Sequence, residues 1–252
     1  MNLSDVVIIS GARTPVGRFG GTLKDVAAYD LGAAAISASL QRAGLEGKDI
    51  DDVLLGSCRQ AGNGPNPSRT AAVRGGIPAS IPTITLNMAC PSGMRALAMA
   101  SQAIRLGEAE VVLVGGFDSM STIPYLLKDA RWQGFKMGNK VLLDGWSDSI
   151  DPLCNLGMGE TAENLGEKYR ISRREQDEFA LSSHQKAAEA RDEGWFDEEI
   201  AAVPVPHKGG DSPMFSRDET IRGGDVHGKA GKAAPCLQKR RDDHSRQCMP
   251  DV

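Results

Sequence analysis

The sequence predicts a layered α/β fold, and two features of its 252 residues indicate it. Short runs of β-branched and other apolar residues alternate with longer stretches whose apolar positions recur at helical spacing, which is typical of strands and helices packed in layers. Apolar residues make up 40% of the chain, aromatic residues only 5%, and there are 29 glycines. This composition suits an α/β enzyme with close backbone contacts and not a fibrous or disordered chain.

The predicted strands are short apolar runs bounded by turn residues. Val6–Ser10 is β-branched and leads into the turn Gly11–Pro15, so it predicts a buried strand. Further apolar runs predict strands at Val53–Leu55, Thr83–Leu86, Val111–Val114 and Val203–Val205.

Helices are predicted from apolar periodicity and from end signals. The first covers Leu31–Ala43, with Gly44 as its C-cap. Gly93–Leu106 is small and apolar almost all round, which predicts a fully buried helix. The last begins at the capping-box pattern Ser172–Glu175 and is amphipathic to about Arg191. Between Ser119 and Gly159 the periodicity fades over a stretch too long for a passive connection, which is typical of a binding loop.

Charge and cysteine usage exclude several classes of protein. The formal net charge is −4 with both signs scattered along the chain, so no basic stripe is present to neutralise a nucleic-acid backbone. No run approaches the roughly 20 apolar residues that span a bilayer, and the first residues lack a secretory pattern. Five cysteines without regular spacing indicate reduced thiols and no disulfide framework or zinc site. We therefore expect a cytoplasmic protein that binds neither nucleic acid nor membrane.

Cys90 is the candidate nucleophile. It follows the strand predicted at Thr83–Leu86 and opens the small-residue helix, so it stands at a helix N-terminus. The free amide hydrogens and the positive end of the helix dipole favour the thiolate there, and the same amides can hold an oxyanion. A cysteine between a strand and a helix is otherwise a core residue, and its position alone leaves both interpretations open.

The wider pattern resembles one protein family. Several segments share the order and spacing of that family: Gly11–Gly21, Gln60–Gly62 with Asn66–Arg69, the Asn87–Gly93 segment around Cys90, Gly115–Ser121 and Met158–Asn164. Together they resemble the thiolase family from Val6 to Arg222, because five motifs in one register are specific where each alone is weak.

The resemblance implies a fold, a reaction and partners. The fold is one αβα half of a five-layer αβαβα assembly with a long loop excursion, and the intact family member is a homodimer or homotetramer. The reaction is a ping-pong Claisen reaction of fatty acid metabolism. Cys90 takes an acyl group from acyl-CoA or 3-ketoacyl-CoA, and a CoA thiolate or an acetyl-CoA enolate then removes it. No cofactor or metal is bound permanently, and coenzyme A and acyl-CoA are substrates.

The same resemblance implies binding residues beyond Cys90. Trp146 and Met158 fall in the loop that lines the pantetheine and acyl channel, and Arg222 falls near the CoA nucleotide. The residues themselves also allow packing within the loop for Trp146, core filling for Met158 and a solvated charge for Arg222.

Three positions depart from the family pattern. Pro91 replaces the usual glycine after the nucleophile, and proline is acceptable in a first helical turn because its missing donor is not needed there. Asp118 stands where glutamate is usual. Gly157 takes the place of a histidine found in some acetoacetyl-specific members, so the substrate preference stays open.

The catalytic histidine and the second cysteine of the family are not found. The family carries them in a Gly-His-Pro segment and a Cys-x-Gly segment, and neither occurs in the sequence. We expect the remaining cysteines and histidines to be structural: Cys58, Cys154, Cys236, Cys248, His184, His207, His227 and His244.

The composition changes after Arg222, where a glycine- and lysine-rich aperiodic stretch predicts an unfolded tail. Codons for Val226 to Cys248, read one base later, can encode a stretch that resembles the next part of a thiolase. Our hypothesis is a frameshift between Arg222 and Val226, which the nucleotide sequence tests. The predicted organisation is a domain of residues 1–118 and 160–222, an excursion at 119–159 for CoA and oligomer contacts, and a frameshifted, disordered tail at 223–252.

The functional alternatives stay open at this point. The first is a thiolase-type acyltransferase that cleaves 3-ketoacyl-CoA or condenses acetyl-CoA. The second is a catalytically inactive fragment that at most binds CoA or a subunit, and such a fragment is expected to expose apolar surface and to be poorly soluble. A decarboxylating ketoacyl synthase is the third, against which the segment with Met158 and Asn164 argues.

Overall fold

The computed structural model describes residues 5–128, 130–145, 150–207 and 211–222, and the chain divides into two compact units. The first unit consists of Met1–Pro124 and Phe196–Thr220, and the second of Tyr125–Trp195 and Ile221–Val252. The tail at 223–252 lies outside the described residues, and the predicted domain boundaries stay a prediction.

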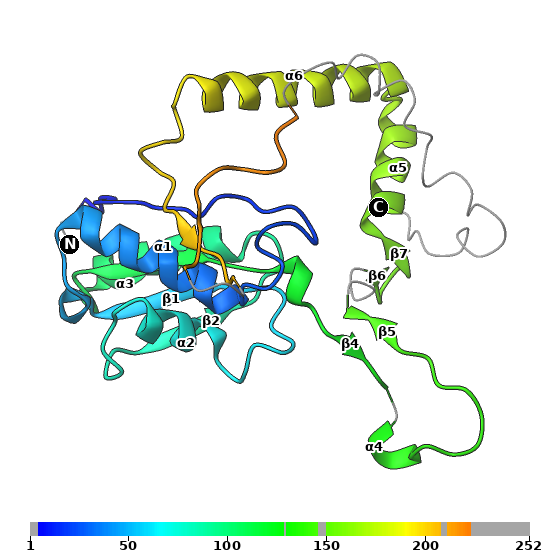
Figure 1. Cartoon of the computed structure of the whole chain (residues 1–252), viewed down its shortest axis with the longest axis horizontal. Coiled ribbons are helices and arrows are strands. Elements are labelled where there is room, and N and C mark those ends of the chain that lie inside the picture. The colour runs from blue at the N-terminus through cyan, green and yellow to red at the C-terminus, as the bar shows by residue number, and fades with distance from the viewer. Residues whose placement is uncertain (1–4, 129, 146–149, 208–210, 223–252) are drawn as a thin grey trace. The chain divides into compact units, whose positions relative to one another are not determined.

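A three-stranded parallel sheet forms the centre of the first unit (Figure 1). Its strands are β1 (Asp52–Gly56), β2 (Thr83–Leu86) and β3 (Val112–Gly116), in the order β2-β1-β3. Val53 pairs with Thr83 and with Leu113. All three strands were predicted, and the α/β class with a parallel sheet is confirmed.

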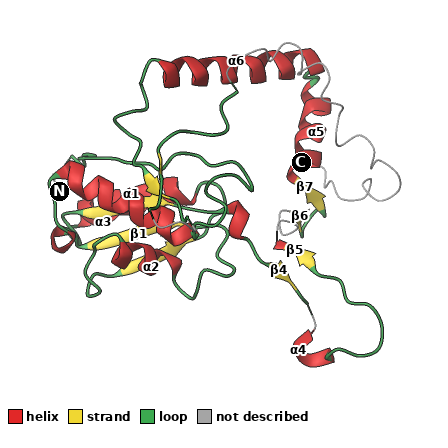
Figure 2. Cartoon of the chain, viewed as in Figure 1, coloured by secondary structure: helices red, strands yellow, loops and turns green. Residues whose placement is uncertain are grey.

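Helices cover both faces of this sheet because side chains alternate along β1. Val53 and Leu55 pack with α1 (Ala28–Ala43) and α2 (Pro67–Arg74) in one buried cluster. Leu54 packs on the opposite face against α3 (Ser92–Leu106). The first unit is therefore an αβα sandwich, whose helices and strands are separated by colour in Figure 2.

The ends of α1 and α2 follow from local chemistry. Gly44 closes α1 with a φ of 67°, a left-handed conformation that glycine adopts without steric cost. Asn66 caps α2 by accepting a hydrogen bond from the Arg69 amide at 3.0 Å, and Pro67 follows as the first helical residue. The predicted C-cap of α1 is confirmed, and α1 begins three residues earlier than the periodicity indicated, at Ala28.

Two predictions about buried elements are wrong. Val6–Ser10 forms no strand, and Ile8 is 77% exposed, because the segment pairs with no strand within the described residues. The helix α3 is not buried all round: Ala96 and Ala100 pack on the sheet, whereas Met94 is 75% exposed. The face of α3 that points away from the sheet has no further layer packed on it among the described residues, so its apolar side chains stay exposed.

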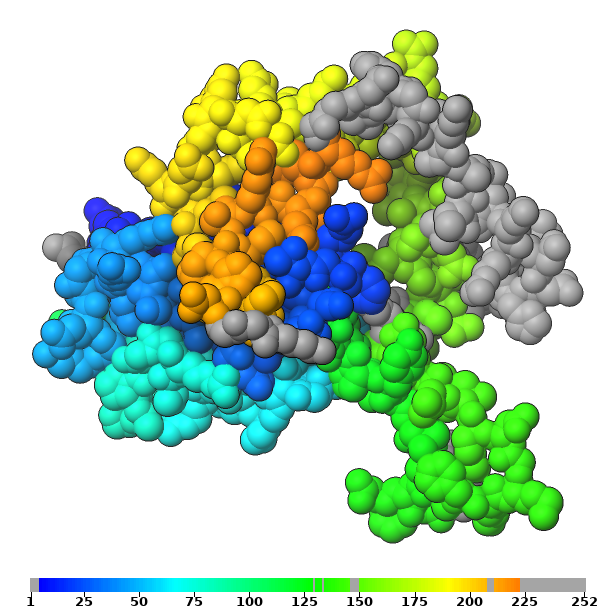
Figure 3. All heavy atoms as spheres, viewed as in Figure 1, coloured from blue at the N-terminus to red at the C-terminus, as the bar shows by residue number. Residues whose placement is uncertain are grey.

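The segment from Phe196 onward closes the first unit. It contains β8 (Val203–Pro204) and β9 (Met214–Phe215), an antiparallel pair, and it returns to the N-terminal loop. Asp218 accepts two hydrogen bonds from the Arg13 guanidinium, at 2.9 and 3.1 Å, and one from the Val16 amide at 2.7 Å. In Figure 3 this segment, drawn in orange, lies against the dark blue N-terminal loop.

The second unit has short strand pairs followed by two helices. Its elements are β4 (Tyr125–Leu126), α4 (Ala130–Gln133), β5 (Leu143–Asp144), β6 (Ile150–Asp151), β7 (Leu156–Gly157), α5 (Met158–Tyr169) and α6 (Arg173–Asp192). Before α6, Ser172 donates its amide to the Glu175 carboxylate at 2.7 Å and accepts from the Glu175 amide at 3.3 Å. The predicted capping box and the helix it opens are confirmed. The helix α5 was not predicted.

Short 3₁₀ turns complete the described regular structure, at Gly47–Asp49 and Met120–Thr122 in the first unit. None of the helices in the described ranges is both long and apolar enough to cross a membrane.

Candidate active site

The loops after the three parallel strands meet at one edge of the sheet. Because β1, β2 and β3 run in the same direction, their carboxyl ends lie together, which is where open α/β sheets carry their binding sites. The loop after β1 begins with Ser57–Arg59, the loop after β2 contains Cys90, and β3 is followed by Phe117 and Asp118. The predicted nucleophile therefore stands at the edge of the sheet where chemistry is expected.

Cys90 is held in a sharp turn between β2 and α3. Ala89 has a φ of +53°, a left-handed conformation that costs a non-glycine residue on the order of 1 kcal/mol. The Ala89 amide donates to the Asn87 side-chain oxygen at 3.0 Å. Ser92 is buried, and its hydroxyl donates to the Ala89 carbonyl at 2.6 Å and accepts from the Met88 amide at 2.8 Å. These contacts offset the strain and present an exposed Cys90 thiol.

Pro91, which follows Cys90, is well suited to the start of α3. Pro91 is the N-cap, and its carbonyl accepts the first helical hydrogen bond from the Arg95 amide at 2.9 Å. Its lack of an amide hydrogen costs nothing at this position, as the sequence indicated. Among the described residues none accepts a hydrogen bond from the Cys90 amide.

A glycine allows α3 to approach the sheet. A Cβ atom added at Gly56, the last residue of β1, would lie 2.6 Å from the Ser92 Cβ and 2.9 Å from the Gly93 nitrogen. Real Cβ atoms essentially never approach so closely, so only glycine fits there. The position of Ser92, and through it the Cys90 turn, depends on this contact.

Asp118, two residues after β3, fixes the start of the loop that follows β1. Its carboxylate accepts hydrogen bonds from the Ser57 hydroxyl at 3.1 Å, the Cys58 amide at 3.2 Å, the Cys58 thiol at 3.0 Å and the Arg59 amide at 2.9 Å. Burial, followed by the hydrogen bond and the charge of Asp118, raises the pKa of the Cys58 thiol to about 11. Cys58 is therefore a thiol and a hydrogen-bond donor near neutral pH, in agreement with the structural role expected for it.

The other predicted site residues belong to the second unit or lie outside the described residues. Met158 is the first residue of α5 and is 69% exposed, and Arg222 is exposed as well. Both belong to the second unit, whereas Cys90 belongs to the first. Trp146 lies outside the described residues.

The remaining histidines and cysteines were expected to be structural. His184 lies in α6, and its Nδ1 accepts a long hydrogen bond of 3.4 Å from the Arg222 amide. Cys154 is half-buried in the second unit. Four of the residues predicted to be structural lie outside the described residues: His227, His244, Cys236 and Cys248.

Sequence reasoning missed the residues that build the Cys90 turn. Asn87 and Ser92 are types that hydrogen-bond nearby backbone, and their positions three residues before and two residues after Cys90 were an available signal. Asp118 was noticed only as a departure from the family pattern. Its contacts with residues about 60 positions earlier had no signal in the sequence.

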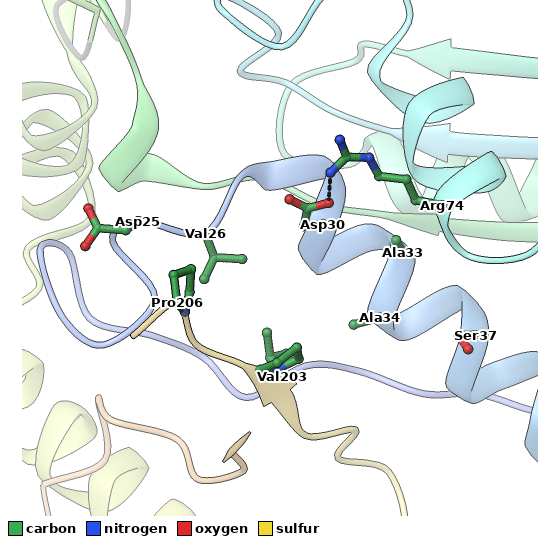
Figure 4. Close-up of a pocket in the computed structure, with 10 residues that line it drawn as sticks. Asp25, Val26, Asp30, Ala33, Ala34, Ser37, Arg74, Val203 and Pro206 are labelled. Carbon is green, nitrogen blue, oxygen red and sulfur yellow. Dashed lines mark hydrogen bonds and ion pairs between the residues drawn. The ribbon is translucent and has the colours of Figure 1, made fainter. Parts of the chain in front are cut away.

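Two hollows of the first unit lie away from Cys90. One, of about 390 Å³, is formed by α1 and the β8 segment and contains the ion pair between Asp30 and Arg74 (Figure 4). The other, of about 160 Å³, is lined by Val6–Ser10, by β3 with the residues before it, and by parts of α1 and α3. Neither is lined by a predicted site residue. Within the described ranges no three His, Cys, Asp or Glu side chains are grouped to hold a metal ion.

Comparison with known proteins gives one consistent result. Residues 6–240 match the family described as "Thiolase, N-terminal domain", so the match extends past Arg222. The chain is 45% identical over 239 residues to a probable acetyl-CoA acyltransferase of Staphylococcus epidermidis, covering 94% of this chain and 60% of that protein. It is 42% identical over 239 residues to a protein of the same description from Staphylococcus aureus, covering 94% of this chain and 61% of that protein.

A solved structure agrees with these relatives. The crystal structure of the Bacillus anthracis acetyl-CoA acetyltransferase is 39% identical to this chain, with a TM-score of 0.83. The similarity covers 90% of this chain and 56% of that one. The chain thus spans about 60% of the length of the relatives it matches.

Proposed function

Because this chain belongs to the thiolase family and has its layered α/β fold, we propose that it serves CoA-dependent acyl transfer, with Cys90 as the acyl acceptor. One observation carries the proposal. The Cys90 thiol is exposed on a strained turn at the carboxyl edge of a parallel sheet. The backbone amide of Cys90 itself has no hydrogen-bond acceptor among the described residues.

The first chemical step follows from these groups. The Cys90 thiolate attacks the carbonyl carbon of an acyl-CoA, the carbonyl oxygen becomes an oxyanion, and the Cys90 amide donates a hydrogen bond to it. When the intermediate collapses, the bond to the CoA sulfur breaks and CoA leaves as a thiolate. With a 3-ketoacyl-CoA the Cys90 thiolate instead attacks the 3-keto carbon, the bond between C2 and C3 breaks, and acetyl-CoA leaves as an enolate that takes up a proton. The acyl group is then held as a thioester on Cys90.

The second step removes the acyl group. In the thiolytic direction a CoA thiolate attacks acyl-Cys90, and in the Claisen direction an acetyl-CoA enolate attacks it and forms a carbon–carbon bond. Each route returns a free Cys90 thiolate, so one difficult reaction is divided into two easier ones. The relatives' names, acetyl-CoA acyltransferase and acetyl-CoA acetyltransferase, support this substrate class.

Binding of CoA is proposed for three residues by family resemblance. These are Trp146 and Met158, both within the excursion at 119–159, and Arg222 near the nucleotide. The exposed side chains of Met158 and Arg222 are compatible with ligand contact. The prediction that no cofactor or metal stays bound is unchanged.

The test is acyl labelling of the full chain. After incubation with acetyl-CoA, we expect mass spectrometry to find the acetyl group on the peptide that contains Cys90. The Cys90→Ser variant should lose the label, and the matched control Cys154→Ser should keep it. A label that persists in Cys90→Ser would remove Cys90 from this role.

The second candidate is a chain that lacks catalytic turnover and at most binds CoA or another subunit. It is favoured by the absence from the sequence of the Gly-His-Pro and Cys-x-Gly segments that supply a base and a proton donor in the family. Exchange between acetyl-CoA and acetoacetyl-CoA separates the candidates. Labelled Cys90 without exchange supports a nucleophile without turnover, and exchange supports the acyltransferase.

Oligomer contacts are proposed for the excursion. It exposes several large apolar side chains, among them Trp132, Phe135, Met137 and Leu153, which a monomer would leave in water. Light scattering would report a dimer or tetramer. A cytoplasmic location and a change of reading frame between Arg222 and Val226 stay predictions, and the nucleotide sequence decides the second.

A further inference from the structure

Asp118, two residues after β3, links that strand to the start of the loop after β1. Its side chain contacts three consecutive residues of the loop, Ser57, Cys58 and Arg59. A carboxylate has about four acceptor positions, and four donors from this loop occupy them at 2.9–3.2 Å. Hydrogen bonds to a charged acceptor are stronger than neutral ones. The loop after β1 is therefore fixed at its start by one residue that follows the neighbouring strand β3.

The same loop is joined to the turn that carries Cys90. The Ser57 amide donates to the Leu86 carbonyl at 3.0 Å, and the Asn87 side-chain amide donates to the Cys58 carbonyl at 3.5 Å. Asn87 in turn accepts from the Ala89 amide, next to Cys90. A continuous path of hydrogen bonds thus runs from Asp118 through the β1 loop and Asn87 to the nucleophile turn.

The turn needs such support because it is strained. Ala89 holds a left-handed backbone conformation, which persists in a non-glycine residue only where surrounding contacts impose it. Ser92 supports the turn from the α3 side, and Asn87 supports it from the β1 side. Loss of Asn87's anchorage would leave the turn held from one side only.

We propose that Asp118 is a positioning residue for Cys90, acting through the Ser57–Arg59 loop and Asn87 on the turn that presents the thiol. The four hydrogen bonds that Asp118 accepts come from Ser57, Cys58 and Arg59 and not from Cys90, so Asp118 is not a catalytic residue. The inference rests on the proposed function of Cys90 for its effect on acyl transfer.

The chain offers a matched control. Asp51 also joins β1 to β3 with a carboxylate, by accepting from the Glu110 amide at 2.8 Å and the Val111 amide at 2.9 Å. It does so at the opposite, amino edge of the same sheet, before both strands begin. Asp51→Ala therefore removes carboxylate–amide bonds of the same kind, two where Asp118 has four, without touching the path to Cys90.

The experiment compares Asp118→Ala, Asp118→Glu and Asp51→Ala in the full chain. Hydrogen exchange measured by mass spectrometry should accelerate about 10-fold or more in the Leu86–Cys90 peptide of Asp118→Ala, because charge-assisted bonds are lost. Asp51→Ala should leave that peptide unchanged, and Asp118→Glu should restore it. Acyl transfer from acetyl-CoA to Cys90 should fall about 10-fold in Asp118→Ala alone.

Each result decides the question. Equal exchange of the Leu86–Cys90 peptide in Asp118→Ala and Asp51→Ala would overturn the inference, as would failure of Asp118→Glu to restore it. If the alanine variant does not fold, Asp118→Asn takes its place, since it keeps one acceptor oxygen and loses the charge. If the wild-type chain never acylates Cys90, the proposed function fails, while the exchange measurement still decides the role of Asp118.

Discussion

Gly56 is the position at which one added methyl group should do the most damage near Cys90. In Gly56→Ala the new Cβ would lie 2.6 Å from the Ser92 Cβ, about 0.8 Å short of the 3.4 Å at which ordinary contact begins. It would also lie 2.9 Å from the backbone of Ser92 and Gly93, which cannot rotate away. The helix α3 must therefore move off β1.

The cost can be estimated from overpacking in well-packed sites, which is typically about 1–3 kcal/mol. For a protein of this size that corresponds to a fall in Tm of roughly 3–10 °C. Because Ser92 holds the Met88 amide and the Ala89 carbonyl, the shift should also disturb the Cys90 turn. We expect slower acyl transfer to Cys90 in addition to lower stability.

Gly93→Ala is the matched control for this substitution. Its Cβ would meet the Gly115 carbonyl oxygen at 3.5 Å, an ordinary contact, and alanine favours a helix by up to about 1 kcal/mol over glycine. Thermal unfolding followed by circular dichroism should show Gly56→Ala below the wild type and Gly93→Ala at or above it. Equal Tm values for the two variants would refute the steric reasoning.

Two further predictions concern ionisable groups in the first unit. At pH 8 we expect iodoacetamide to label Cys58 on the order of 100-fold more slowly than an ordinary thiol, because a pKa of about 11 leaves little thiolate. The exposed Cys90 should be labelled first. Comparable labelling of the Cys58 and Cys90 peptides would contradict this. For Asp218, burial alone would raise the pKa, but the hydrogen bonds and charge of Arg13 with the Val16 amide outweigh it and lower the pKa. The stability that Asp218 contributes should therefore be complete above its unfolded pKa of about 3.9 and be lost as pH falls through the lower folded pKa. Asp218→Asn should cost on the order of 1–2 kcal/mol at pH 7 and less at pH 3, measured by urea unfolding, and a pH-independent difference would count against the ion pair.

The sequence predicted several local elements of both units correctly. The strands at Val53–Leu55 and Thr83–Leu86, the C-cap Gly44 and the capping box at Ser172 all depend on residues within a few positions of one another. Such patterns follow from the two-residue period of a strand, the 3.6-residue period of a helix and the hydrogen bonds at helix ends. The resemblance to the family was likewise carried by short motifs.

Exposure of apolar segments was predicted less well. Val6–Ser10 and the helix α3 were expected to be buried, since both are apolar on more than one side. Burial depends on what packs against a segment, and in the described residues only one face of α3 has a partner. A local pattern reports which surface a segment can bury, and it does not report which partner is present.

The sequence by itself thus identified the α/β class and the helix that begins two residues after Cys90, and it proposed Cys90 as the nucleophile. The tertiary structure alone decided that Asp118 reaches the loop after β1, that Gly56 admits Ser92, and that Met158 belongs to a different unit from Cys90. The contacts of Asp118 and Gly56 join residues tens of positions apart. They exist only because the order β2-β1-β3 brings the carboxyl ends of three strands to one edge. Strand order is set by the packing of the whole unit, for which no short segment carries a signal.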